Sequence, residues 1–212
     1  MNKIALLSTL SFALLTSFGA QAADTAELKV KGVIRPSACS PSFTGDGVVD
    51  YGTIPAKSLN ATTGTLLPAK TIPFAITCDG PTRIALRTID NRASSMVTGL
   101  TPVGNAYGLG AYQGKSIGAY NILVTPGSFT ADGSPADVIF EYAGGGSWGK
   151  AASGNLGNTR HSFAPVNTTV PGAYKTITGV FTVQAAITKS SDLPTTETIP
   201  LDGSATIEVQ YL

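Results

Sequence analysis

The sequence predicts an all-β fold, and three observations support this prediction. Charged residues make up only 13% of the chain, and its 24 glycines and 13 prolines are numerous for 212 residues. Apolar residues alternate with polar ones in short runs, which is the period of a half-buried strand. Helical spacing of apolar residues is hard to find beyond the first 22 residues. Short strands separated by turn-rich loops are typical of a β-sandwich or barrel.

The first 22 residues have the pattern of a Sec-type signal peptide. Lys3 precedes an apolar run over positions 4–15, and the segment ends in the small-residue sequence "AQA". The apolar run is shorter than the ~18 residues that a membrane span needs. We therefore expect an exported chain, residues 23–212, without a membrane span.

The expected mature chain is electrically neutral. Removing Lys3 from the 14 basic residues leaves 13, against 13 acidic residues. Neutrality gives no electrostatic reason to expect nucleic acid or an anionic membrane as a partner. A length of about 190 residues suits one domain with a sizeable core.

Alternating runs place the strands along the chain. We predict strands over 27–35, 46–52, 70–78, 82–89, 116–124, 137–142, 174–187 and 203–212. Alternation is clearest in "TIPFAITC", where Ile72, Phe74, Ile76 and Cys78 share one face. The same pattern runs through "YKTITGVFTVQAAI", which suits a long central strand. Glycine-rich loops are expected over 98–115, 125–135 and 143–161.

Cys39 and Cys78 predict a single disulfide bond. Both follow the signal segment, and exported proteins fold where oxidation is the default. Closing a loop of roughly 40 residues stabilises a fold by about 4 kcal/mol in the chain-entropy model. The alternatives, two free thiols or a metal pair, have less support because no histidine or third cysteine lies nearby.

Signals of catalysis are poor. The single histidine, His161, lies in the polar stretch "GNTRHSF" without a neighbouring carboxylate, so we expect a solvated loop histidine rather than a catalytic base. The glycine-rich "GDG" and "GLGAYQG" lack the residues of a phosphate-binding loop. Asp46 and Asp50 do not form a recognisable calcium loop. The sequence therefore predicts no enzyme, no cofactor and no metal site.

Aromatic residues in the expected loops leave a second function open. Tyr107, Tyr112, Phe129 and Trp148 could stack on sugars or on a partner surface. They would then belong to a ligand-binding protein of the periplasm or to a fimbrial tip adhesin that binds carbohydrate or a host surface. Exposed loop aromatics without a ligand are the plainer interpretation.

Both ends of the expected mature chain alternate strongly. Leu28, Val30 and Ile34 share one face near the N-terminus, and Gly32 interrupts that face. At the other end, the run "ATIEVQYL" places alternate apolar side chains on one side. A terminal strand frays unless it is paired, so each end needs a partner strand.

These ends resemble the pilin subunits of the chaperone–usher pathway of Gram-negative bacteria. The resemblance rests on the signal segment, on the alternating N-terminal segment with Gly32, on "GVIRPSAC" and on "ATIEVQYL" with its penultimate tyrosine. More narrowly, "SACSPSFTGDGVVDYG", "IDNRASS", "NAYGLGAYQGKSIGAY" and "LDGSATIEVQYL" resemble the GltF-like family of fimbria-associated periplasmic proteins. That similarity spans most of the chain after the signal.

The pilin resemblance implies an incomplete immunoglobulin-like β-sandwich over 35–212, preceded by a donor-strand extension over 23–34. An open groove in such a sandwich takes a strand from another molecule. The extension would insert into a neighbouring subunit through Leu28, Val30, Gly32 and Ile34. The last strand would line its own groove through Ala205, Ile207, Val209 and Tyr211, and the terminal carboxylate of Leu212 would meet a chaperone.

The implied partners are a periplasmic chaperone, an outer-membrane usher and neighbouring subunits. The implied location is the periplasm and then a fimbrium on the cell surface. The alternative for the N-terminal segment is a first strand, over 27–39, that pairs within its own domain.

Overall fold

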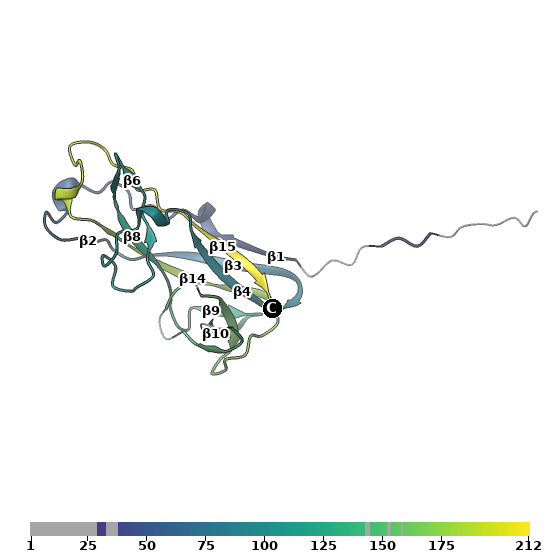
Figure 1. Cartoon of the computed structure of the whole chain (residues 1–212). Coiled ribbons are helices and arrows are strands. Elements are labelled where there is room, and N and C mark those ends of the chain that lie inside the picture. The colour runs from purple at the N-terminus through teal and green to yellow at the C-terminus, as the bar shows by residue number, and fades with distance from the viewer. Residues whose placement is uncertain (1–28, 33–37, 143–144, 152–153, 158) are drawn as a thin grey trace, which may run out of the picture. The chain divides into compact units, whose positions relative to one another are not determined.

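The all-β prediction is confirmed by the computed structural model, which describes residues 29–32, 38–142, 145–151, 154–157 and 159–212. Antiparallel strands dominate this part of the chain (Figure 1). The longer strands are β1 (Cys39–Phe43), β3 (Lys70–Thr82), β4 (Ile84–Asp90), β8 (Gly118–Val124), β9 (Phe129–Ala131), β10 (Ser134–Glu141), β13 (His161–Pro165), β14 (Tyr174–Ile187) and β15 (Ala205–Tyr211).

Shorter elements fill the connections. They are the strands β2 (Thr65–Leu66), β5 (Tyr107–Gly108), β6 (Ala111–Tyr112), β7 (Lys115–Ser116), β11 (Trp148–Lys150) and β12 (Gly154–Asn155), with the 3₁₀ turns η1 (Thr44–Gly47), η2 (Ala56–Ser58), η3 (Ala93–Ser95) and η4 (Ser190–Asp192). The expected glycine-rich loops therefore contain short strands of their own. No helix of the described residues is long and apolar enough to span a membrane.

The strand order places the first and the last strand at opposite ends of one path. Hydrogen-bonded neighbours follow the order β1-β3-β14-β9-β10-β13-β4-β15. Strand β14 is the central element, as its long alternating run predicts: its first half lies between β3 and β9, and its second half pairs with β8 and β2. Strands β1 and β15 are the two end strands of this path, and they contact each other.

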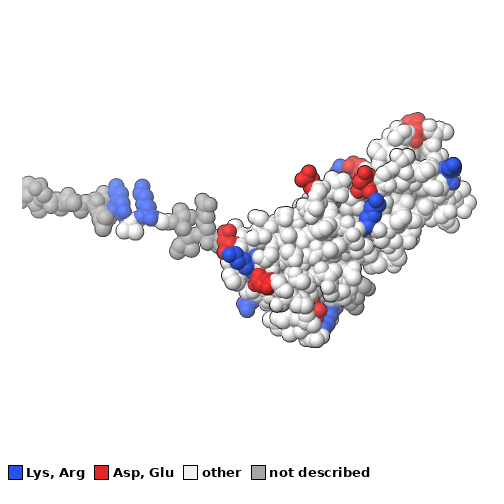
Figure 2. Space-filling view, turned by 180° about the vertical axis from the view of Figure 1, so that it is seen from behind, with Lys and Arg blue, Asp and Glu red and all other residues white. Residues whose placement is uncertain are grey.

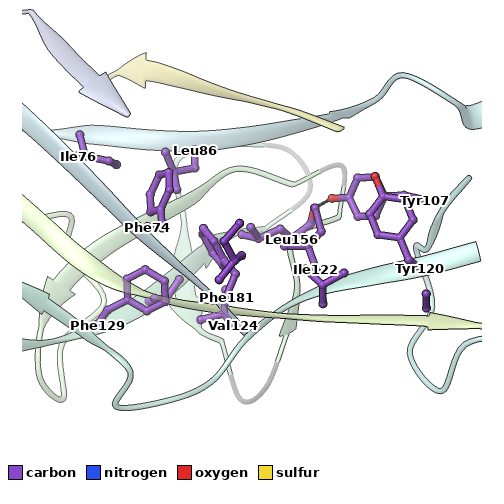
Figure 3. Close-up of a cluster of buried hydrophobic side chains, with 14 of the residues drawn as sticks. Phe74, Ile76, Leu86, Tyr107, Tyr120, Ile122, Val124, Phe129, Leu156 and Phe181 are labelled. Carbon is purple, nitrogen blue, oxygen red and sulfur yellow. Dashed lines mark hydrogen bonds between the residues drawn. The ribbon is translucent and has the colours of Figure 1, made fainter. Parts of the chain in front are cut away.

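The core is a cluster of aromatic and branched side chains from alternate strand positions. Phe74, Phe129 and Phe181 pack with ring centroids about 5 Å apart, 4.9 Å for Phe74 and Phe181 and 5.3 Å for Phe129 and Phe181 (Figure 3). A second aromatic pair, Tyr107 and Tyr120, stacks at 5.3 Å toward the other end of the cluster. Burial of this apolar surface is the main stabilising contribution to the fold.

The predicted disulfide between Cys39 and Cys78 is present and joins β1 to β3. The two residues lie directly opposite each other in the antiparallel register of these strands. Cys78 is buried and Cys39 is half-buried, so the bond fixes an edge strand to the core. Strand β1 has few apolar side chains of its own, and the disulfide offsets that deficit.

The predicted strand over 46–52 is wrong, and three of the longer strands, β1, β9 and β13, were not predicted. The segment 46–52 contains the end of η1 and an extended stretch that has no strand partner. Gly45, Asp46 and Gly47 all have positive φ angles, which break a strand at its start. Strands β1 and β13 lack clear alternation because "CSPSF" is polar and "HSFAP" is buried on both faces, and β9 is only three residues long.

The N-terminal segment forms a separate unit from the domain, with the division between Ile34 and Arg35. The expected signal, residues 1–22, lies outside the described residues. Of the predicted strand over 27–35, the structure describes residues 29–32, and these four residues have no regular secondary structure. Within these four residues, Val30 is 90% exposed.

Candidate functional site: an apolar cleft between the two edge strands

A cleft of about 880 Å³ opens beside the two edge strands of the domain. Its floor follows β14, whose alternate side chains Phe181, Val183, Ala185 and Ile187 are all buried. Four alternate positions span six residue steps, or roughly 20 Å at about 3.3 Å per residue. The cleft is therefore a trough with the length and the repeat of a β-strand.

Two chain segments form the walls of this cleft. One wall begins at Phe43 and continues through residues 47–54 to Leu59, and the other runs over residues 193–207 with interruptions. Ile199, Leu201, Ala205 and Ile207 contribute the apolar part of the second wall, and all four are only partly buried. Apolar side chains that stay partly exposed along a trough provide surface that another molecule can bury.

Tyr51 crosses from the first wall to the floor. Its hydroxyl donates a hydrogen bond to the carbonyl of Val183 at 3.1 Å and accepts one from the N–H of Ala185 at 3.2 Å. These backbone groups belong to a stretch of β14 that lies between its partners β3 and β2. Burial raises the pKa of Tyr51, so the hydroxyl stays protonated and keeps both bonds at neutral pH. One side chain thus pairs with the β14 backbone at the break between β3 and β2.

The far end of the cleft is lined by Leu109 and Tyr120. The ring of Tyr120 stacks on Tyr107, whose hydroxyl bonds to Thr88 and to the carbonyl of Leu156. Burial raises the pKa of Tyr107 to about 12 and raises that of Tyr120 further. Both phenols are therefore neutral, and this end of the cleft carries no tyrosinate charge.

Two of the four predicted groove residues of the last strand line this cleft. Ala205 and Ile207 line it, and Val209 packs against the core next to it. The hydroxyl of Tyr211 accepts a hydrogen bond from the N–H of Cys39 at 3.0 Å. Leu212 is 46% exposed at the end of the strand, and its N–H donates to the carbonyl of Arg83.

The predicted donor residues lie in the separate N-terminal unit. Leu28 and Ile34 fall outside the described residues. Val30 is exposed, and no atom lies within 4 Å of the position that a Cβ atom would take on Gly32.

The proposed aromatic ligand surface is not assembled. Tyr107 and Phe129 are 4% and 1% exposed, so the expectation that they lie on exposed loops is wrong. Both occupy strands that pack into the core, which the glycine-rich surroundings concealed. Tyr112 donates its hydroxyl hydrogen to Glu197 at 2.9 Å, and the guanidinium of Arg160 lies 5.9 Å from the ring centroid of Trp148. None of the four aromatic residues, Tyr107, Tyr112, Phe129 and Trp148, lines the cleft.

His161 is buried, which contradicts the predicted solvated position. It is 3% exposed and lies in β13 between β10 and β4. Its Nδ1–H donates to the carbonyl of Thr159, and burial lowers its pKa to about 4. No group of three or more metal-ligating side chains occurs among the described residues.

The cleft floor was the part of the site that the sequence did not identify. Alternation in 174–187 indicated which residues of β14 share a face. It did not indicate that part of this face lines an open cleft. Phe43 carried no signal, and Tyr51 lies in the segment 46–52, which was predicted as a strand and not as a wall of a cleft.

Sequence comparison relates the chain to one family model and to two proteins of Escherichia coli K12. Residues 28–106 match a family model described as a protein of unknown function (DUF1120). The chain is 31% identical to protein GltF of Escherichia coli K12 over 249 aligned positions, covering 100% of this chain and 98% of that protein. It is 26% identical to the uncharacterized protein YhcF of the same strain, with 100% of both chains covered.

Proposed function

This chain belongs to the family of protein GltF. From the shape of its cleft and the sequence of its N-terminal segment, we propose the following function. The protein is a structural subunit of a fimbria and has no catalytic step. After export, residues 28–34 of one copy fill the cleft of the next copy, and a periplasmic chaperone covers the cleft before assembly at an outer-membrane usher.

The observation that supports this proposal is the open apolar cleft at the ends of the strand path. Four alternate side chains of β14 form its floor, and the N-terminal segment offers four alternate positions at Leu28, Val30, Gly32 and Ile34. Burying the three apolar side chains would contribute on the order of 5 to 9 kcal/mol before ordering costs. An uncovered cleft would leave apolar surface and edge strands open to aggregation.

The last strand has the features that a chaperone needs. Ala205 and Ile207 present apolar side chains to the cleft, and the terminal residue Leu212 is accessible. A lent strand would cover the cleft and a basic side chain would hold the terminal carboxylate. Truncation of residues 205–212 should therefore abolish co-purification with the chaperone.

Assembly is the direct test of the proposal. Deletion of 24–32, or the substitution Gly32→Leu, should leave a folded subunit that still binds the chaperone but does not polymerise. Circular dichroism and chaperone pull-down report folding, and electron microscopy of shed fibres reports assembly. The substitution Gly104→Leu is a matched control, because Gly104 also has no atom within 4 Å of its Cβ position. Normal fibres from the deletion variant would overturn the proposal.

The ligand-binding alternative has less support. It needs an exposed set of aromatic side chains, and Tyr107 is buried. The Trp148 ring is covered in part by Arg160, which leaves Tyr112 and Trp148 as separate surface positions on β6 and β11. Glycan-array binding that disappears with Trp148→Ala would favour this alternative over a purely structural subunit.

A further inference from the structure

The charged side chains that line the cleft are both acidic. Among the described residues that line it, the charged ones are Asp50 and Glu197, and both are exposed acids. Two basic side chains lie outside this lining: Arg92 pairs with Asp202 at 2.9 Å, and the Nζ atom of Lys70 lies 5.5 Å from the ring centroid of Tyr51. Charged side chains are sparse on the face of the molecule that Figure 2 shows, where blue and red atoms are scattered over a mostly white surface.

Both acids are held in place by local hydrogen bonds. The Oδ1 atom of Asp50 accepts the N–H of Gly52 at 2.7 Å. The Oε2 atom of Glu197 accepts the hydroxyl of Tyr112 at 2.9 Å and the Nε2–H of Gln113 at 3.0 Å. These bonds use one oxygen of each carboxylate, Oδ1 of Asp50 and Oε2 of Glu197, and leave the other oxygen to accept a hydrogen bond from a partner. Fixed side chains lose less conformational entropy when they bind a charged partner.

The N-terminal segment carries the opposite charge in the complementary positions. Lys29 and Lys31 alternate with Leu28, Val30 and Gly32. In an extended strand, successive side chains point to opposite sides. When the apolar side chains face the floor of the cleft, the two lysines therefore face outward, toward its rim.

We infer that Asp50 and Glu197 select the incoming segment of a second copy by its lysines at positions 29 and 31. This inference rests on the proposed function. Exposed charge pairs add little to equilibrium affinity, but complementary charge raises association rates and disfavours partners with the wrong sign. The acidic rim thus favours the strand of this protein over an equally apolar strand with acidic outward positions.

Association kinetics of a synthetic peptide test the inference. The peptide covers residues 27–35, and stopped-flow fluorescence with labelled peptide measures its association with the full chain. The double substitution Asp50→Asn and Glu197→Gln keeps the shapes and the local acceptors. We expect it to slow association about tenfold at low salt, and we expect the difference to shrink in 0.5 M NaCl, where charges are screened.

Two controls separate this effect from net charge. The substitutions Val166→Lys and Val170→Lys change net charge by the same amount at exposed positions outside the cleft lining, and should leave the rate unchanged. A peptide with Lys29→Glu and Lys31→Glu should bind the wild-type chain slowly and regain speed with Asp50→Lys and Glu197→Lys.

The outcomes distinguish the two proposals. Equal rates for the wild-type and the Asn/Gln chain would overturn the role of the rim, while binding itself would still support the cleft as the acceptor. A wild-type peptide that does not bind, or binds as well after Val30→Asp, would overturn the proposed function together with this inference.

Discussion

The backbone N–H of Cys39 donates a hydrogen bond to the phenolic oxygen of Tyr211, 3.0 Å away, and so joins the first strand to the last. Cys39 begins β1 and Tyr211 ends β15, so the bond lies at one end of the gap between the edge strands. Phe43 and Ala205, at the other ends of the same strands, line the cleft. The gap is therefore bridged at one end and open at the other.

Removing this bridge should loosen the closed end without unfolding the domain. The substitution Tyr211→Phe deletes the acceptor and keeps the ring, and an exposed hydrogen bond of this kind contributes about 1 kcal/mol or less. We expect faster hydrogen exchange at the Cys39 amide and a slightly lower free energy of unfolding. Tyr142→Phe, at another exposed tyrosine, is the matched control. Unchanged exchange at Cys39 would show that the bond does not hold the gap.

Loss of the Tyr51 hydroxyl should have a larger effect. In Tyr51→Phe, the carbonyl of Val183 and the N–H of Ala185 both lose their partner within the cleft floor. Leaving buried backbone groups unpaired costs about 1 to 3 kcal/mol. Chemical denaturation measures the loss, and amide exchange at Ala185 locates it. Tyr112→Phe, whose partner Glu197 is exposed, should cost less; equal losses would contradict the role given to Tyr51.

Reduction of the disulfide should destabilise the domain by about 4 kcal/mol, because the bond closes a separation of 39 residues in the unfolded chain. Urea denaturation with and without a phosphine reductant measures this difference. A chain with Cys39→Ala and Cys78→Ala should be insensitive to the reductant. Stability that is equal in the oxidised and reduced protein would mean that β1 stays attached through its pairing with β3 alone.

The buried His161 predicts a pH dependence of stability. Burial lowers its pKa from 6.5 to about 4, so the unfolded chain binds the proton more readily than the folded chain. Its contribution is therefore complete above about pH 6.5 and is lost as pH falls toward 4, by at most about 3 kcal/mol.

Unfolding free energies measured between pH 7 and pH 4 test this sign. The variant His161→Gln has no group that titrates at this position, so its stability should fall less steeply over the same window. The difference between the two slopes isolates the histidine from the carboxylates. Parallel curves for both proteins would show that His161 accepts a proton in the folded state without cost.

The strand faces were predictable because side-chain alternation is a local property. Strand β14 agrees with the predicted 174–187 at both ends, and the buried residues of β3 are those that alternate in "TIPFAITC". A period of two residues places one set of side chains on one face whatever the strand pairs with. The disulfide was predictable too, since a chain with two cysteines has one possible pairing.

Where alternation is absent, the predictions from the sequence were wrong. "HSFAP" looked like a polar loop, yet β13 lies between two strands and buries both of its faces, including His161. Tyr107 lies among glycines but stacks on Tyr120 in the core. Burial on both faces depends on which other segments pack against each face of the strand. The spacing of residues within the strand does not predict those contacts.

The sequence alone thus determined the all-β class, the faces of the long strands and the disulfide. The tertiary structure alone decided that the first and last strands end the strand path, that Tyr51 pairs with the β14 backbone between β3 and β2, and that Asp50 and Glu197 line the same cleft. The reason is physical: alternation acts over neighbouring residues, whereas a cleft arises from contacts between segments more than a hundred residues apart, such as Tyr51 and Val183.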